Sequence, residues 1–243
     1  DASGTTEAAA TLVAPSGQLL WSRTASASGG QFIAAPKAQP VTGGYVIAWT
    51  QNGTVHLQRY DAAGAAQWSP AVTRTATVGS LGLADLVAGG GGDVIASWVH
   101  YTGSNPILSS KHLYTQKFAD DGEALWPTSG NGAGWPVFDG NSMQNGYFPT
   151  MLSDGAGGAV YAWYEVGSGR KARVQRMNAT GAELFAHNGV AGDSTAGRYS
   201  ISAAAAFDAA TGSTFLFWTD TNTTQSQWGL RAQKFDRGGA VLW

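Results

Sequence analysis

The sequence predicts an all-β fold built from repeated four-stranded units, and three observations support this prediction. Glycine accounts for 34 of the 243 residues, about twice its usual share, which implies many tight turns. Charged residues make up 12% of the chain, about half the usual fraction. Short apolar segments separated by glycine turns recur along the whole sequence. Because large all-β domains often reach this length, we expect a single domain over residues 1–243.

One recurring element ends in an aromatic residue that stands four positions after a glycine. Its fullest form reads Gln, then Arg or Lys, then an aromatic residue or Met, then Asp or Asn, with the glycine three positions later. Asp or Asn followed by glycine is typical of turns, because the side chain bonds nearby backbone and glycine adopts positive φ. The element therefore predicts a hairpin. The closing aromatics are Trp68, Trp126, Phe185 and Trp243, and a degenerate first copy ends at Trp21.

A second element precedes each full copy and consists of a glycine turn followed by an apolar run that ends in Trp. Such nearly continuous apolar runs predict central strands covered on both faces, with the tryptophans in the core. The glutamines of the first element are interpreted as internal amides that bond neighbouring backbone. The tryptophans are Trp49, Trp98, Trp163 and Trp218, and the glutamines are Gln58, Gln116, Gln175 and Gln233.

Four-stranded units with Trp signatures are typical of β-propeller blades. The two elements together resemble the repeats of bacterial extracellular β-propellers, and they cover nearly the whole chain. The resemblance implies a scaffold and specifies no ligand. The predicted units are a half-repeat over about 1–30 and full repeats over 31–80, 81–140, 141–195 and 196–243. A four- or five-bladed ring and a part of a larger ring are both compatible with this count.

Composition excludes several functional classes. The absence of cysteine excludes disulfides and thiolate metal sites. A net charge of −2 without clustered basic residues argues against nucleic-acid and anionic-membrane partners. We expect no metal or other cofactor, because the Asp-Gly turns at 120–122 and 154–155 lack the ligand pattern of a calcium loop. The charge-poor, Trp-rich composition resembles that of many bacterial secreted proteins, so we expect an extracellular or cell-surface location.

The candidate site lies in the variable loops, which strand direction places on one face. These are the second-to-third and fourth-to-first connections of the units, over residues 99–111, 127–145, 164–171, 187–198 and 219–228. Binding residues often lie in such loops. An indole outside the repeated elements can stack on a sugar, or it can pack its loop onto the scaffold. The candidate residues are His100, Tyr101, Trp135, Asp139, Glu165, Arg170, Asp220 and Trp228.

The sequence favours a non-catalytic, lectin-like recognition or adhesion module that binds a carbohydrate or a protein surface. One alternative is a structural subunit or spacer of a cell-surface fibre or envelope assembly, which the incomplete terminal repeats suggest. The other is a glycosidase that uses paired carboxylates, with Glu165 and either Asp220 or Asp139 as the pair. No recognisable nucleophile, metal or phosphate-binding motif is present, so we do not expect an enzyme.

Overall fold

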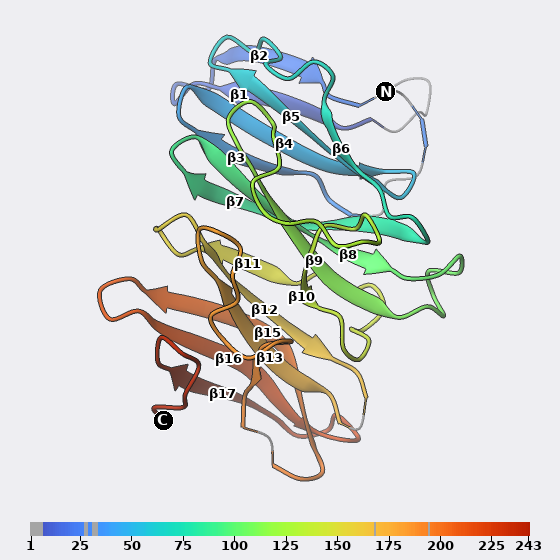
Figure 1. The fold of residues 1–243 in the computed structure, drawn as a ribbon, viewed down its shortest axis with the longest axis vertical. Helices are drawn as coiled ribbons and strands as arrows, with labels where there is room; N and C mark the ends of the chain where they lie inside the picture. The colour runs from blue at the N-terminus through green and yellow to red at the C-terminus, as the bar shows by residue number, and fades with distance from the viewer. Residues whose placement is uncertain (1–6, 27–28, 31–33, 168, 194) are drawn as a thin grey trace.

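The chain is all β in the computed structural model, which describes residues 7–26, 29–30, 34–167, 169–193 and 195–243. These residues form seventeen strands and no helix, so they contain no helix able to span a membrane. The strands make five antiparallel sheets, each built from strands that are consecutive in the chain. Successive sheets pack against one another in chain order (Figure 1). The prediction of an all-β fold is confirmed, and three of the sheets have the four antiparallel strands predicted for a full repeat; the sheet of the last predicted repeat, residues 196–243, has three.

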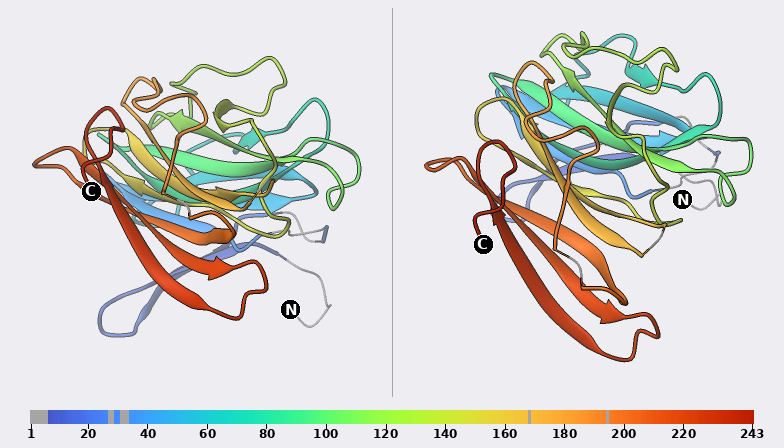
Figure 2. Two further views of the ribbon diagram at one scale, coloured as in Figure 1. Left: turned by 90° about the horizontal axis from the view of Figure 1, so that it is seen from below. Right: turned by 60° about the horizontal axis from the view of Figure 1, so that its bottom comes forward.

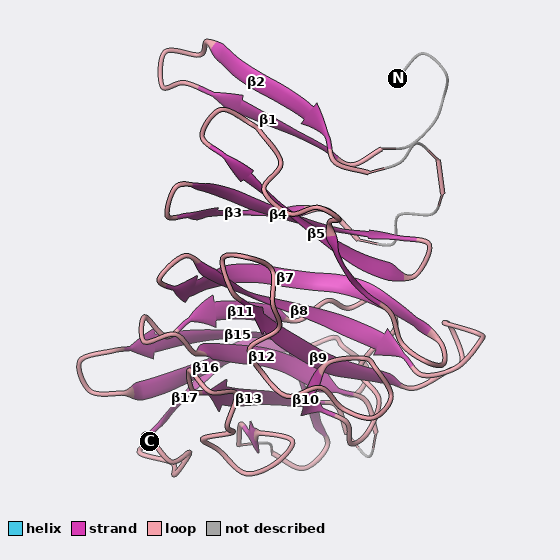
Figure 3. Ribbon diagram, turned by 45° about the horizontal axis from the view of Figure 1, so that its top comes forward, coloured by secondary structure: helices cyan, strands magenta, loops and turns pink. Residues whose placement is uncertain are grey.

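Each sheet is a meander in which every strand pairs with the next (Figure 3). The first sheet has two strands, β1 (Ala9–Val13) and β2 (Leu19–Thr24). The second contains β3 (Lys37–Val41), β4 (Gly44–Gln51), β5 (Thr54–Asp61) and β6 (Val72–Arg74). The third contains β7 (Ser80–Gly90), β8 (Asp93–Tyr101), β9 (Lys111–Phe118) and β10 (Trp135–Phe138). The fourth contains β11 (Thr150–Ser153), β12 (Ala159–Glu165), β13 (Lys171–Met177) and β14 (Val190–Ala191), and the fifth contains β15 (Arg198–Asp208), β16 (Ser213–Asn222) and β17 (Trp228–Phe235).

Two of the predicted loops contain a strand. Residues 127–145 include β10 and residues 187–198 include β14, so the prediction that these segments only connect the fourth strand of one unit to the first strand of the next is wrong. These strands have only four and two residues, too few for an alternating pattern to show in the sequence. Residues 168 and 194 of the predicted loops, and residues 27–28 and 31–33 near the first predicted repeat boundary, lie outside the described residues.

The second strand of each four-stranded sheet, which is β4, β8 or β12, is buried on both faces. On β8, Val94 and Trp98 belong to a cluster with residues of the second sheet. Ile95 and Val99, which alternate with them, belong to a cluster with residues of the fourth sheet. The four strand tryptophans are at most 2% exposed, which confirms their predicted place in the core. Each sheet therefore depends on its neighbours for burial.

The repeated glutamines hold the closing aromatics in place. Gln58 Nε2 donates to the carbonyl of Trp68 at 2.9 Å, and the Trp68 amide donates back to Gln58 Oε1 at 3.1 Å. Gln116 makes the same pair of bonds with Trp126, at 3.0 and 2.9 Å. The prediction of internal amides is confirmed. In the last two sheets the glutamine oxygen accepts a backbone amide, that of Phe185 for Gln175 and that of Asp193 for Gln233.

The first four closing aromatics each contact the glycine turn of the following sheet. The indole of Trp126 donates to the carbonyl of Ala179 at 2.9 Å, and a Cβ on Gly181 would lie 2.8 Å from the Trp126 ring. Only glycine tolerates that approach together with its φ of +80°. The same hydrogen bond joins Trp21 to Ala62 and Trp68 to Asp120, and the same ring contact joins Trp21 to Gly64, Trp68 to Gly122 and Phe185 to Gly239.

This contact predicts a difference between two glycine substitutions. Gly43 has the same φ of +80°, but nothing lies within 4 Å of where its Cβ would be. Gly43→Ala should lower the free energy of unfolding by about 1–2 kcal/mol through backbone strain. Gly181→Ala should cost about 1–3 kcal/mol more, because the methyl group overpacks Trp126. Urea denaturation of both variants measures the difference, and equal losses would contradict the proposed role of the ring contact.

Candidate functional site

A hollow of about 470 Å³ lies where the loops of the third, fourth and fifth sheets meet. The β8–β9 loop, the segment before β11, the β12–β13 loop and the start of β15 form its walls. These connections all belong to the face on which the variable loops were predicted. Its lining includes Leu108, Lys111, Gln144, Asn145, Arg170 and Tyr199. The hollow therefore combines an aromatic ring, amides and basic groups.

Arg170 is held in this hollow by its backbone and by an aromatic ring. Its carbonyl accepts the amide of Ser200 at 2.8 Å, which ties the β12–β13 loop to β15. Its guanidinium carbon lies 5.2 Å from the centre of the Tyr199 ring, within the range of a cation–π contact. No carboxylate forms an ion pair with Arg170 among the described residues. The guanidinium thus keeps its capacity to bind an anion.

Lys111 contributes a second basic group at the wall of the hollow. It is 4% exposed, and its Nζ donates to the carbonyl of Ile107 at 2.7 Å. Desolvation by burial lowers the pKa of Lys111. A second hollow of about 440 Å³ shares Tyr199 and is lined by Lys171 and Arg198. None of the described residues that line the two hollows is Asp or Glu, so an anion meets no acidic side chain in their walls.

Of the eight residues predicted from the sequence, Arg170 lines the first hollow. His100 and Tyr101 are each 4% exposed, and His100 Nε2 bonds the carbonyl of Val78 at 2.8 Å. Trp228 lies at the start of β17 and is 56% exposed. Its indole stays a candidate for stacking outside the hollow.

Glu165 and Asp220 are each bound by arginine. Glu165 is 5% exposed, and its Oε1 lies 3.0 Å from the guanidinium of Arg173. Asp220 is 3% exposed and binds Arg198, with Arg231 at 3.5 Å. The arginines compensate the charge of these buried carboxylates, which would be costly to leave unpaired. Neither carboxylate lines either of the two hollows.

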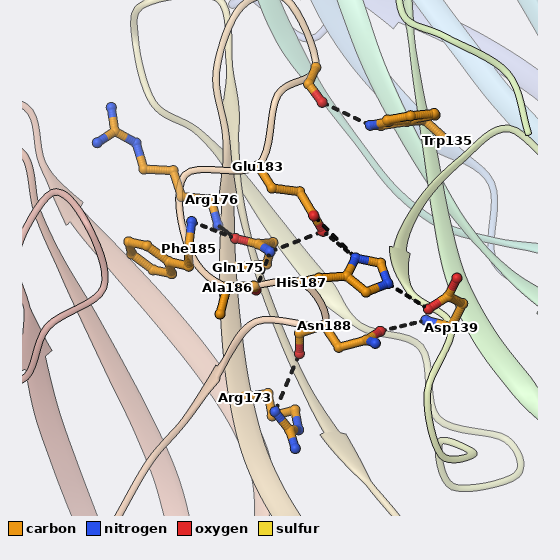
Figure 4. Close-up of polar contacts among 11 residues, drawn as sticks. Trp135, Asp139, Arg173, Gln175, Arg176, Glu183, Phe185, Ala186, His187 and Asn188 are labelled. Carbon is orange, nitrogen blue, oxygen red and sulfur yellow. Dashed lines mark hydrogen bonds and ion pairs between the residues drawn. The ribbon is translucent and has the colours of Figure 1, made fainter.

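Trp135 and Asp139 belong to a polar cluster between the third and fourth sheets (Figure 4). The Trp135 indole donates to the carbonyl of Gly181 at 2.8 Å, so it packs its segment onto the neighbouring sheet. His187 bridges two carboxylates, with Nε2 3.0 Å from Asp139 and Nδ1 3.1 Å from Glu183. The cluster fastens the end of β10 to the connection between β13 and β14.

Sequence reasoning missed Lys111, Gln144, Asn145 and Tyr199. Tyr199 lies within β15, outside the predicted loops, and Lys111 begins β9 at the last position of a predicted loop. Gln144 and Asn145 lie in a predicted loop but carry neither a charge nor an aromatic ring. A usable signal was the pair of consecutive basic residues, Arg170 and Lys171, where the β12–β13 loop enters β13, with no acidic residue beside them in the sequence.

The sequence matches no protein-family model and no curated protein. Among solved structures, it is similar to a family 43 glycoside hydrolase, YxiA, from Bacillus licheniformis, with 13% sequence identity and a TM-score of 0.41. The match covers 85% of this chain and 58% of that chain. At this level of similarity, the match says nothing about the activity of this protein.

The bridge at His187 predicts a pH-dependent contribution to stability. Partial burial alone would lower the pKa of His187, but Glu183 and Asp139 outweigh it and raise the pKa above its usual value. A folded-state pKa above the unfolded value of about 6.5 gives stability that is complete below that value and lost as pH rises through the folded pKa.

His187→Gln should therefore destabilise the protein more at pH 6 than at pH 8.5. The difference should be at most about 1 kcal/mol, because the imidazole is half exposed and its ion pairs are screened. Chemical denaturation of wild type and variant at both pH values measures it. A variant whose stability loss is the same at both would show that the imidazole charge has no role in the bridge.

Proposed function

We propose that the protein is a non-catalytic recognition module of the bacterial cell exterior, and that its sheets are blades of a β-propeller. The meander in each sheet and the stacking in chain order support the propeller. The first strands of successive sheets, β3, β7, β11 and β15, also lie against one another, as strands around a common axis would. Stacked rigid sheets suit binding, because they present loops from several units on one face.

We infer that the ligand is a carbohydrate that carries a carboxylate, bound in the hollow at Arg170. The observation that carries this proposal is the Arg170 guanidinium, which lies over the ring of Tyr199 and has no acidic partner within the part of the chain that the structure describes. A guanidinium binds a carboxylate through two parallel hydrogen bonds. Tyr199 offers a ring for the apolar face of a sugar, and Gln144 and Asn145 offer amides for its hydroxyls.

The arginine pairs of Glu165 and Asp220 support binding without catalysis. Glycoside hydrolysis needs one carboxyl group to protonate the leaving oxygen and a second to act as base or nucleophile beside the sugar. Here both carboxylates are engaged within the scaffold, and the lining of the hollow at Arg170 contains neither. The hollow therefore supplies recognition groups and no pair of acids.

Binding of acidic and neutral forms of one sugar tests the proposal. Wild type should bind a glucuronate-containing oligosaccharide at least tenfold more tightly than its glucose counterpart, because the charged hydrogen bonds add about 1.5–3 kcal/mol. Arg170→Gln should abolish that preference. Tyr199→Ala should weaken both sugars by about three- to tenfold through the lost stacking surface.

Arg74→Gln is the matched control, since Arg74 also lies over an aromatic ring, 4.8 Å from the centre of Phe118, but outside the hollow. Isothermal titration calorimetry on the four proteins gives the affinities. Equal preference for the acidic sugar in wild type and Arg170→Gln would rule out the proposed site, as would an equal loss in Arg74→Gln.

A further inference from the structure

Four asparagines of the chain are each followed by glycine, a sequence that undergoes spontaneous deamidation. The backbone nitrogen of the glycine attacks the side-chain carbonyl carbon of the asparagine, and the missing Cβ of glycine leaves that approach open. Hydrogen bonds that fix the side chain or the glycine amide oppose the reaction, because both groups must rotate toward each other. The four asparagines are Asn52, Asn131, Asn145 and Asn188.

Two of these asparagines have their side chains fixed by hydrogen bonds. Asn131 Oδ1 accepts the amide of Ala133 at 2.9 Å, and its Nδ2 donates to the hydroxyl of Tyr114 at 3.0 Å. Asn188 Oδ1 accepts the amide of Asp139 at 2.8 Å. The glycine after each of them also donates its amide to a carbonyl, at 3.0 and 2.8 Å. The fold therefore protects both sites.

Asn52 is held by its backbone, in the two-residue turn between β4 and β5. It has a left-handed φ of +53°, and Gln51 and Thr54 on either side of the turn pair with each other in the sheet. Rotation that brings the Gly53 nitrogen to the Asn52 side chain would disturb this pairing. The hairpin therefore opposes the reaction at this site.

Asn145 and Gly146 lack such constraints. They form the middle of a turn that is closed by one long hydrogen bond, from the amide of Tyr147 to the carbonyl of Gln144 at 3.2 Å. Among the described residues, neither the Asn145 side chain nor the Gly146 amide makes a hydrogen bond. Both residues are exposed, and nothing lies within 4 Å of where a Cβ on Gly146 would be. The two reacting groups can therefore meet without the loss of another contact.

This turn lies between two anchored residues in the wall of the hollow. Met143 is 1% exposed, and its amide donates to the carbonyl of Lys111 at 3.0 Å. The ring of Tyr147 packs on that of Tyr164, with 4.4 Å between their centres. The segment connects the third sheet to the fourth, which Figure 2 shows as neighbouring green and gold layers. A change of charge in the turn thus takes place in the wall of the hollow that Arg170 also lines.

We propose that Asn145 is a modification site whose slow deamidation switches off the binding of acidic ligands. The Gly146 nitrogen forms a bond to Cγ of Asn145, and the side-chain nitrogen leaves as ammonia, taking up the proton of the glycine amide. Water then opens the cyclic imide at one of its two carbonyls, which gives aspartate or isoaspartate. The net reaction consumes one water and releases one ammonia. Each product adds a carboxylate to a wall whose described residues include no Asp or Glu.

The new carboxylate would compete with the ligand for Arg170. Within reach of the guanidinium, it makes the paired hydrogen bonds that the carboxylate of the ligand would otherwise make. Out of reach, it still repels an anion across the hollow. In both cases the affinity for an acidic sugar should fall at least about tenfold. This effect on binding rests on the proposed function, whereas the reaction itself depends only on the turn.

Peptide mapping by mass spectrometry, after incubation of the folded protein at mildly alkaline pH, tests the reaction. The peptide with Asn145 should change from amide to acid at least about tenfold faster than the other three, because those sites must first lose hydrogen bonds. In concentrated urea, which removes this protection, the four sites should react at similar rates. Equal rates in the folded protein, or a slower rate at Asn145, would overturn the proposal.

Gly146→Ala should suppress the reaction, because its methyl group hinders the attacking nitrogen. The matched control is Gly43→Ala, since Gly43 has a φ of +80° where Gly146 has +75°, and both have open space at the Cβ position. Gly43→Ala should leave the rate at Asn145 unchanged. Near-ultraviolet circular dichroism checks that both variants are folded. An unchanged rate in Gly146→Ala would contradict attack by the glycine nitrogen, and an equal loss in Gly43→Ala would contradict a local effect.

Asn145→Asp fixes one product and tests its effect on binding by isothermal titration calorimetry. It should bind the glucuronate-containing oligosaccharide at least about tenfold more weakly than wild type, and the glucose counterpart less than about fivefold more weakly. Gln18→Glu adds the same charge at an exposed position outside the hollow and should bind like wild type.

Aged protein separates the two possible failures. Wild type should lose affinity for the acidic sugar as Asn145 reacts, whereas Gly146→Ala treated in the same way should keep it. Deamidated wild type that binds as tightly as fresh protein would overturn the switch. Fresh wild type without a preference for the acidic sugar would instead overturn the proposed function and the switch that rests on it, whatever the rate of deamidation.

Discussion

The contact between a closing aromatic and the glycine turn of the following sheet is the constraint on which the rest of the structure depends. Each four-stranded sheet is a single layer whose second strand is apolar on both faces, so none of these sheets can bury its core alone. The aromatic fixes where the next sheet lies, and the glycine lets the ring approach the backbone. Gln58 and Gln116 hold their tryptophans in position from within the sheet. The loop ends of neighbouring sheets are thereby brought together.

The sequence was informative about the sheets because their signals are local. The alternation and apolar runs that mark a strand lie within a few residues, so the burial of Trp98 and the backbone bonds of Gln116 could be predicted. The glycine and the aromatic of one copy also stand together in the sequence. Their true partners belong to adjacent copies, and no pattern within one repeat reveals that Gly181 receives Trp126.

The candidate site was harder to predict because it depends on pairings between distant residues. Glu165 and Asp220 were predicted in variable loops, but antiparallel pairing places Arg173 and Arg198 on the neighbouring strands, each two residues from the position directly opposite the acid. Tyr199 was overlooked because it lies inside β15, although its ring supports Arg170 from the next sheet. In a chain with few charged residues, a charged side chain that has no ion-pair partner indicates where a charged ligand can bind. That residue can be recognised only after the other pairs are known.

The hollow at Arg170 depends on the joints between sheets, because its walls come from the third, fourth and fifth sheets. Arg170 is tied to the fifth sheet by its carbonyl, which accepts the amide of Ser200, and by the ring of Tyr199. A change in the packing between the fourth and fifth sheets would therefore move the guanidinium relative to Lys111 and Gln144. The contacts that stack the sheets thus also set the geometry that a bound carboxylate would meet.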